Sequence, residues 1–213
     1  MAGEMVIAPF PRPRSGTRLG LGFAPLPGPG FVVAARYQAS PIGPFTELNI
    51  VEPVRRNRLR AGLAVTLSVV NDDRARRDGR ANWGFPRELG TLRWDGGDGA
   101  IRLTWDEGRL ALEAVPSRLA FPLLVPLRLV QHRGPDPVSV PVRLRGMART
   151  ARVNLAVPED GPLAFLAGVH RGIVVAAPRL RIAPAETPHR WAALGDRLGR
   201  RTAPIAPGLG PNG

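Results

Sequence analysis

The sequence predicts one β-rich domain of the α+β type, in which a strongly curved, barrel-like antiparallel sheet is accompanied by a few short helices. Short apolar runs follow one another closely, and many of the 25 Gly and 24 Pro residues fall between them, as turn residues do in β proteins. One polar segment after Val70 interrupts this pattern with a helix start signal. The 213 residues, 44% of them hydrophobic, suffice for a single domain with a real core.

Composition divides the chain into three parts. Residues 1–30 are rich in Pro and Gly and are expected to form a peripheral arm without much regular structure. Residues 31–184 are expected to form the domain. Residues 185–213 read as a tail that allows a short helix near 191–198.

The first strands are predicted over 31–38, 45–54 and 63–70, where apolar and β-branched residues dominate. A short helix should follow, with Asn71 as its N-cap and an end between Gly79 and Gly84. Further strands are expected over 89–97, 99–105, 109–115, 121–131, 138–157 and 172–182. Asp106 to Gly108 should form a hairpin turn, and 161–168 one or two helical turns.

The composition excludes several classes of site. Without Cys there can be no disulfide, thiolate nucleophile or Cys-ligated metal. The three His residues show no ligand spacing, so neither a metal nor a cofactor is expected. No signal peptide or spanning apolar run is evident, which predicts a soluble cytoplasmic protein without a membrane partner.

The formal net charge is +13, and all of the 30 basic residues are Arg. This charge permits contact with polyanions without specifying it. Two basic clusters are the candidates for such contact, but no aromatic-rich motif accompanies them, which argues against nucleic acid as a partner. The clusters are Arg55, Arg56, Arg58 and Arg60, then Arg74, Arg76, Arg77 and Arg80.

Two segments carry the most specific signal. SPIGPFTEL (Ser40–Leu48) and DGRANWGFPRELG (Asp78–Gly90) stand in the order and spacing of the paired signatures of the acetoacetate decarboxylase family, which this chain resembles. The resemblance implies a sheet curled into a cone or barrel around a buried pocket. It implies a Schiff-base Lys at the position of Arg87, a basic neighbour at Glu88 and a pocket carboxylate at Glu47. It also makes a homo-oligomer plausible.

The Schiff-base chemistry of that family requires a primary amine, and this chain has no Lys. A guanidinium stays protonated in proteins, so Arg87 can be neither nucleophile nor base. A carboxylate at Glu88 beside Arg87 would stabilise a cation further. A second pocket carboxylate that the resemblance implies has no counterpart between Phe31 and Ala39.

Arg87 and Glu47 therefore have three readings. Arg87 could bind the carboxylate of a small keto or hydroxy acid, with Trp83, Phe85 and Glu88 around it. Glu47 could then act as a general base in enolisation, hydration or dehydration. Alternatively, the two could form a buried ion pair that only holds the sheet together. A non-catalytic protein that binds a polyanion through its Arg-rich surface remains the alternative from another class.

Overall fold

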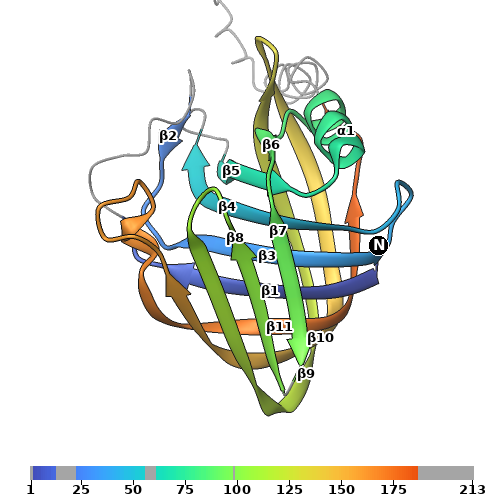
Figure 1. Ribbon diagram of the computed structural model, residues 1–213. Coiled ribbons are helices and arrows are strands. Elements are labelled where there is room, and N and C mark those ends of the chain that lie inside the picture. The colour runs from blue at the N-terminus through green and yellow to red at the C-terminus, as the bar shows by residue number, and fades with distance from the viewer. Residues whose placement is uncertain (1, 13–22, 56–60, 98, 187–213) are drawn as a thin grey trace, which may run out of the picture.

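The computed structural model describes residues 2–12, 23–55, 61–97 and 99–186 of the protein (Figure 1). The first half of the chain holds β1 (Ala2–Phe10), β2 (Ala24–Pro25), β3 (Gly30–Ala39), β4 (Phe45–Arg55), β5 (Ala61–Val70), α1 (Asp73–Trp83) and β6 (Arg87–Leu89). The second half holds β7 (Leu92–Gly97), β8 (Ala100–Trp105), β9 (Leu110–Arg133), β10 (Asp136–Ala156), the 3₁₀ turn η1 (Ala164–Leu166) and β11 (Gly168–Ile182). The predicted helical turn within 161–168 is thus confirmed as η1.

All of these strands belong to one sheet, in the order β6-β5-β4-β3-β1-β11-β10-β9-β8-β7, with β2 added beside β4. A single parallel pairing of Leu63 with Leu129 joins β5 to β9 and closes part of the sheet into a ring. The predicted β-rich, strongly curved fold is confirmed. The sheet is mixed rather than wholly antiparallel, because β6 also runs parallel to β5, and the ring is not a regular barrel (Figure 1).

β1 corrects the expected N-terminal arm. Instead of packing loosely, Ala2–Phe10 forms a strand between β3 and β11 in the middle of the sheet. Met5 and Val6 are both buried although they point to opposite faces. A strand buried on both faces shows no alternation of apolar and polar residues, so its sequence lacks the usual strand signal.

β9 and β10 form a long bent hairpin that runs the length of the molecule (Figure 1). The separate strands expected over 109–115 and 121–131 are one strand, β9. A register shift between Arg149 and Ala151 interrupts its pairing with β10. Such irregularities let a strand bend without ending, which is why one strand serves two parts of the sheet.

The helix α1 begins one residue later than expected. Asp72 is the N-cap, and its carboxylate accepts a hydrogen bond from the backbone N–H of Ala75 at 2.6 Å. Asn71 instead accepts from the backbone N–H of Thr46 at 2.8 Å, tying the helix start to β4. The helix ends at Gly84, where φ is +70° and an added Cβ would lie 2.1 Å from the carbonyl oxygen of His132.

The strands β1, β3, β4 and β5 separate two apolar regions. One face, which includes Val6, Val32 and Leu48, packs against β7, β8 and the ends of β9 and β10. The opposite face lines the interior of the ring together with the hairpin β9–β10 and β11. The helix α1 lies at one end of this ring (Figure 1), and the site is built there.

Two other expectations concern the chain ends. Glu186 forms a bridge with Ser139, so the segment just after β11 folds back on β10. The remainder of the expected tail and its short helix near 191–198 lie outside the described residues.

Candidate functional site

The centre of the candidate site is a buried ion pair between two strands. Arg87, the first residue of β6, donates from one terminal nitrogen to Glu47 Oε2 of β4 at 2.7 Å. Arg87 is 4% exposed and Glu47 5% exposed. The two residues are 40 apart in the sequence, and β5 lies between their strands. The structure thus brings together the two residues that sequence analysis selected.

Tyr37 on β3 completes the arrangement, and sequence analysis missed it. Its hydroxyl donates to Glu47 Oε1 at 2.8 Å, so both oxygens of Glu47 are engaged. Burial raises the pKa of Tyr37 well above 10, and the negative charge of Glu47 and their hydrogen bond raise it further, while Arg87 opposes the shift. Tyr37 therefore stays a neutral donor. Tyr37 is the only Tyr of the chain and lies on a predicted strand, so the sequence offered a reason to consider it as a site residue.

The helix α1 shapes the seat of Arg87. The other terminal nitrogen of Arg87 donates to the backbone carbonyl of Ala75 at 2.8 Å. Gly79 leaves room for the side chain, since a Cβ added there would lie 2.5 Å from Arg87 Cδ. The guanidinium carbon lies 5.7 Å from the ring centroid of Phe45 and 5.4 Å from that of Phe85.

Arg87 still has donors to offer. A guanidinium carries five N–H groups, and the hydrogen bonds to Glu47 and Ala75 engage only the terminal nitrogens. Its Nε is buried and has no hydrogen-bond partner among the described residues. An unsatisfied buried donor costs roughly 1–3 kcal/mol, so an additional acceptor at this place would stabilise the protein.

Arg87 lies in the wall between two hollows. An interior cavity of about 340 Å³ fills the ring and is lined by Glu47, Arg87 and Phe85 among others. An outer cleft of about 700 Å³ lies between the β3–β4 turn, α1 and the end of β11. Tyr37 and Arg87 line both hollows. A ligand that approaches from the cleft would therefore meet Arg87 before it reaches the cavity.

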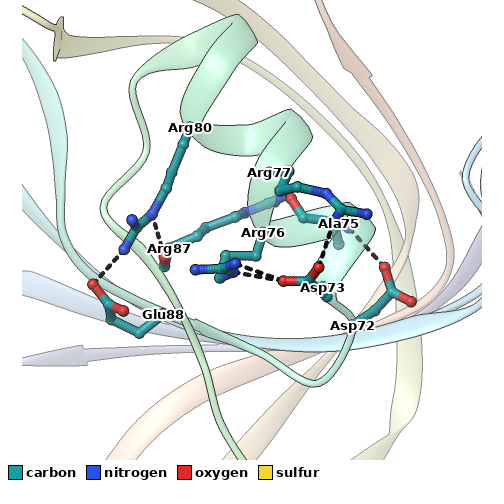
Figure 2. Close-up of polar contacts among 8 residues, drawn as sticks. All are labelled: Asp72, Asp73, Ala75, Arg76, Arg77, Arg80, Arg87 and Glu88. Atoms are coloured by element: carbon teal, nitrogen blue, oxygen red, sulfur yellow. Dashed lines mark hydrogen bonds and ion pairs between the residues drawn. The ribbon is translucent and has the colours of Figure 1, made fainter.

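The other predicted site residues lie in different places. Phe85 lines the interior cavity, whereas Trp83 lines the outer cleft and donates from its indole N–H to the carbonyl of Ala183 at 3.2 Å. Glu88 lines neither hollow. Its side chain is 70% exposed and forms an ion pair with Arg80, as Figure 2 shows. The expectation that Glu88 flanks the Arg87 guanidinium is wrong, because successive strand residues point to opposite faces.

The basic cluster on α1 is largely paired. Asp73 binds Arg76 and Arg77 at 2.7 and 2.8 Å, and Arg80 binds Glu88 (Figure 2). Such exposed pairs contribute little stability, but they leave this helix face poorly suited to capture an anion. Of the other cluster, only Arg55 lies within the described residues.

Within the described ranges, no group of three or more His, Asp or Glu side chains could hold a metal ion. His170 contacts the carbonyl oxygen of Leu166, and His132 packs edge-on against Phe23. No helix in the same ranges is long and apolar enough to cross a membrane.

No family model matches the sequence, and no curated protein matches it either. Solved structures do match. One is the acetoacetate decarboxylase of Legionella pneumophila subsp. pneumophila str. Philadelphia 1, with a TM-score of 0.60 and 16% identity over 86% of each chain. Another is an acetoacetate decarboxylase-like enzyme from Sphingomonas wittichii RW1, with a TM-score of 0.67 and 14% identity over 87% of this chain and 90% of that one.

A third is the enduracididine biosynthesis enzyme MppR complexed with pyruvate, with a TM-score of 0.65 and 18% identity over 87% of this chain and 88% of that one. MppR was also solved with the condensation product of pyruvate and imidazole 4-carboxaldehyde. The fold of this chain is therefore that of acetoacetate decarboxylase and similar enzymes.

Proposed function

We propose that the protein binds a small keto or hydroxy acid at Arg87, between the outer cleft and the interior cavity, and that it does so without forming a Schiff base. The observation that carries this proposal is the buried Arg87, which lines both hollows and keeps an unpartnered donor. A planar guanidinium suits a carboxylate in size, charge and hydrogen-bond geometry. The pyruvate complex of MppR, which shares the fold, supports a keto acid as the ligand class.

Glu47 bears directly on how such an acid would bind. A ligand carboxylate at Arg87 would place a second negative charge close to Glu47, and like charges repel strongly when buried. Replacing Glu47 with Gln removes this repulsion and keeps hydrogen-bonding capacity toward both Tyr37 and Arg87. Glu47→Gln should therefore bind an acid more tightly than the wild type does, by about tenfold or more.

The test compares two variants that differ only at position 87. Glu47→Gln keeps Arg87, whereas Glu47→Gln with Arg87→Met keeps an apolar stem and removes the cation. Glu47→Gln leaves the buried charge of Arg87 without its carboxylate partner until an acid binds, which destabilises the ligand-free variant by about 3–5 kcal/mol. The double variant removes both charges and has no such penalty. The measurement is the melting temperature with and without pyruvate, acetoacetate and lactate.

A ligand at 100 times its dissociation constant raises the free energy of unfolding by about 2.7 kcal/mol. For a chain of this size that corresponds to a rise of roughly 5–10 °C. We expect such a rise for the wild type and for Glu47→Gln, and none for the double variant. If no acid shifts any of the three proteins, the Arg87–Glu47 pair only holds β4 and β6 in place.

Among the residues that line the interior cavity, Glu47 is the one carboxylate, and it could accept an α-proton from a keto acid held at Arg87. Exchange of pyruvate methyl protons in D₂O, followed by NMR, tests this reaction. Exchange that Glu47→Gln abolishes while binding persists would make the protein an enzyme of enolisation. Equal exchange in both proteins would leave the site a binding site.

A polyanion remains the alternative partner because of one feature of the outer surface. Arg143 lies directly opposite Arg181, and Arg145 opposite Arg179, on the paired strands β10 and β11. All four are exposed, and none forms an ion pair within the part of the chain that the structure describes. Like charges in directly opposite positions destabilise a sheet.

Binding to duplex DNA or heparin at several salt concentrations tests this alternative. Four phosphate contacts predict a slope of about −3.6 in a plot of log affinity against log salt for DNA. Arg143→Gln with Arg181→Gln should halve that slope. An affinity that the double change does not alter would exclude this surface. The cytoplasm and a homo-oligomeric assembly remain proposals, and light scattering after size-exclusion chromatography tests the assembly.

A further inference from the structure

The interior cavity has a shape and a lining that a small acid does not use. Tyr37, Glu47 and Arg87 lie at one end of it. Apart from Asn49, the other residues that line it are apolar. Six of them are Val33, Leu123, Val125, Leu127, Leu129 and Leu144. Ligand sites with one polar end and apolar walls select molecules with the same division.

The apolar lining extends along β3 away from the polar end. Phe31 and Tyr37 both line the cavity, and they are six residues apart on β3, or roughly 20 Å along an extended strand. The cavity of about 340 Å³ therefore has polar groups toward the Tyr37 end of β3 and apolar side chains toward the Phe31 end.

The apolar end of the cavity adjoins a second hollow. Ile7, Phe31 and Ile173 line both the cavity and this hollow of about 1010 Å³. The second hollow lies at the Phe31 end of β3, whereas the outer cleft lies at the Tyr37 end.

We infer that the acid bound by this protein carries an aliphatic chain, which lies in the interior cavity with its carboxylate at Arg87. This inference rests on the acid-binding role proposed above for Arg87. The chain replaces water against apolar walls, and each buried methylene contributes about 0.8 kcal/mol, or close to a fourfold gain in affinity. Short keto acids would then be the weakest members of the ligand class.

The experiment is a calorimetric titration of the wild type with butanoate, hexanoate, octanoate and decanoate, each below its micelle concentration. Affinity should rise about fifteenfold for each two methylenes. Methyl octanoate, which lacks the charge, should bind far more weakly than octanoate. The double variant Glu47→Gln with Arg87→Met should lose this preference for the charged form.

A pair of variants on β9 tests whether the aliphatic chain of the ligand lies in the interior cavity. Val125→Phe fills the cavity, whereas Leu124→Phe enlarges a neighbouring side chain that lies outside the cavity and is 73% exposed. We expect Val125→Phe to bind butanoate as the wild type does and to lose most of the gain from butanoate to octanoate. Leu124→Phe should keep the whole gain.

The outcomes separate the two proposals. If butanoate and octanoate bind equally well through Arg87, the acid site stands and the aliphatic chain is refuted. If no acid of any length binds, the acid site fails and the chain inference fails with it. If methyl octanoate binds as tightly as octanoate, the chain is held elsewhere than at Arg87 and the inference is overturned. The wild-type series decides between these results even if Val125→Phe does not fold.

Discussion

Gly79→Ala should destabilise this protein, although the same change stabilises most helices. Gly79 lies inside α1, where Ala is normally favoured over Gly by about 1 kcal/mol. Here the new Cβ would lie 2.5 Å from Arg87 Cδ and 2.8 Å from its Nε. Arg87 must move by about 1 Å to restore ordinary contact distances near 3.5–4.0 Å.

The loss of stability follows from the hydrogen bonds that Arg87 forms. Its hydrogen bonds to Glu47 and Ala75, at 2.7 and 2.8 Å, cannot both survive such a movement. A hydrogen bond of a charged group contributes about 1.5–3 kcal/mol, and overpacking adds about 1–3 kcal/mol. After the helix gain of about 1 kcal/mol, we expect a net loss of about 1.5–5 kcal/mol, which lowers the melting temperature by roughly 3–20 °C.

Urea unfolding of a double-mutant cycle isolates the contact. The reference background combines Arg87→Ala with Glu47→Gln, which removes the clash and leaves no unpaired buried charge. Gly79→Ala in that background should stabilise the protein by about 1 kcal/mol, as in an ordinary helix. If Gly79→Ala stabilises both backgrounds equally, Gly79 does not position Arg87 and this account of the site is wrong.

Four further predictions concern Ala177, Tyr37, the absence of Lys and a Lys restored at position 87. Ala177 has φ of +46° at the irregularity between β10 and β11, so Ala177→Gly should raise the free energy of unfolding by about 1 kcal/mol; a lower urea midpoint would contradict this. Because the pKa of Tyr37 is raised, the neutral hydroxyl stabilises the folded protein below pH 10, and this stability is lost as pH rises through the folded-state pKa. Absorbance at 295 nm should therefore show this single Tyr ionising only as the protein unfolds. Ionisation near pH 10 in the folded protein would refute the buried hydroxyl. Borohydride with acetoacetate or pyruvate should trap no adduct inside residues 23–186, since the chain has no Lys. For the same reason, no carbon dioxide should form above background. A modified peptide from this range, found by mass spectrometry, would overturn the argument. Arg87→Lys alone should restore little, because Glu47 would pair with the new ammonium and keep it protonated.

Local signals predicted the local structure well. The acidic residues before α1 and the Gly after it indicated a short helix, and the structure shifts only the cap from Asn71 to Asp72. Both residues are good caps, but the Asn71 side chain instead accepts a hydrogen bond from the backbone of Thr46 on a distant strand. Sequence alone does not tell which of two adjacent caps a neighbouring strand will occupy.

The long-range features were harder to predict. β1 is central, yet its residues alternate in no visible way because both of its faces are buried. β9 is one strand that continues through Pro116, although two separate strands were expected over 109–115 and 121–131. The orientation of Glu88 followed from the period of a strand, but the segment had first to be recognised as the strand β6.

Composition alone sets one chemical limit: without Lys, the domain has no side-chain amine to form an iminium, whatever its fold. That conclusion needs only the identity of the residues, because a guanidinium stays charged in any surroundings found in proteins. The folded arrangement was needed to show that Tyr37, Glu47 and Arg87 meet, that Glu88 faces solvent, and that an apolar cavity adjoins the ion pair. Proximity of this kind depends on the register of strands far apart in the sequence and on the closure of β5 against β9, and no local pattern encodes either.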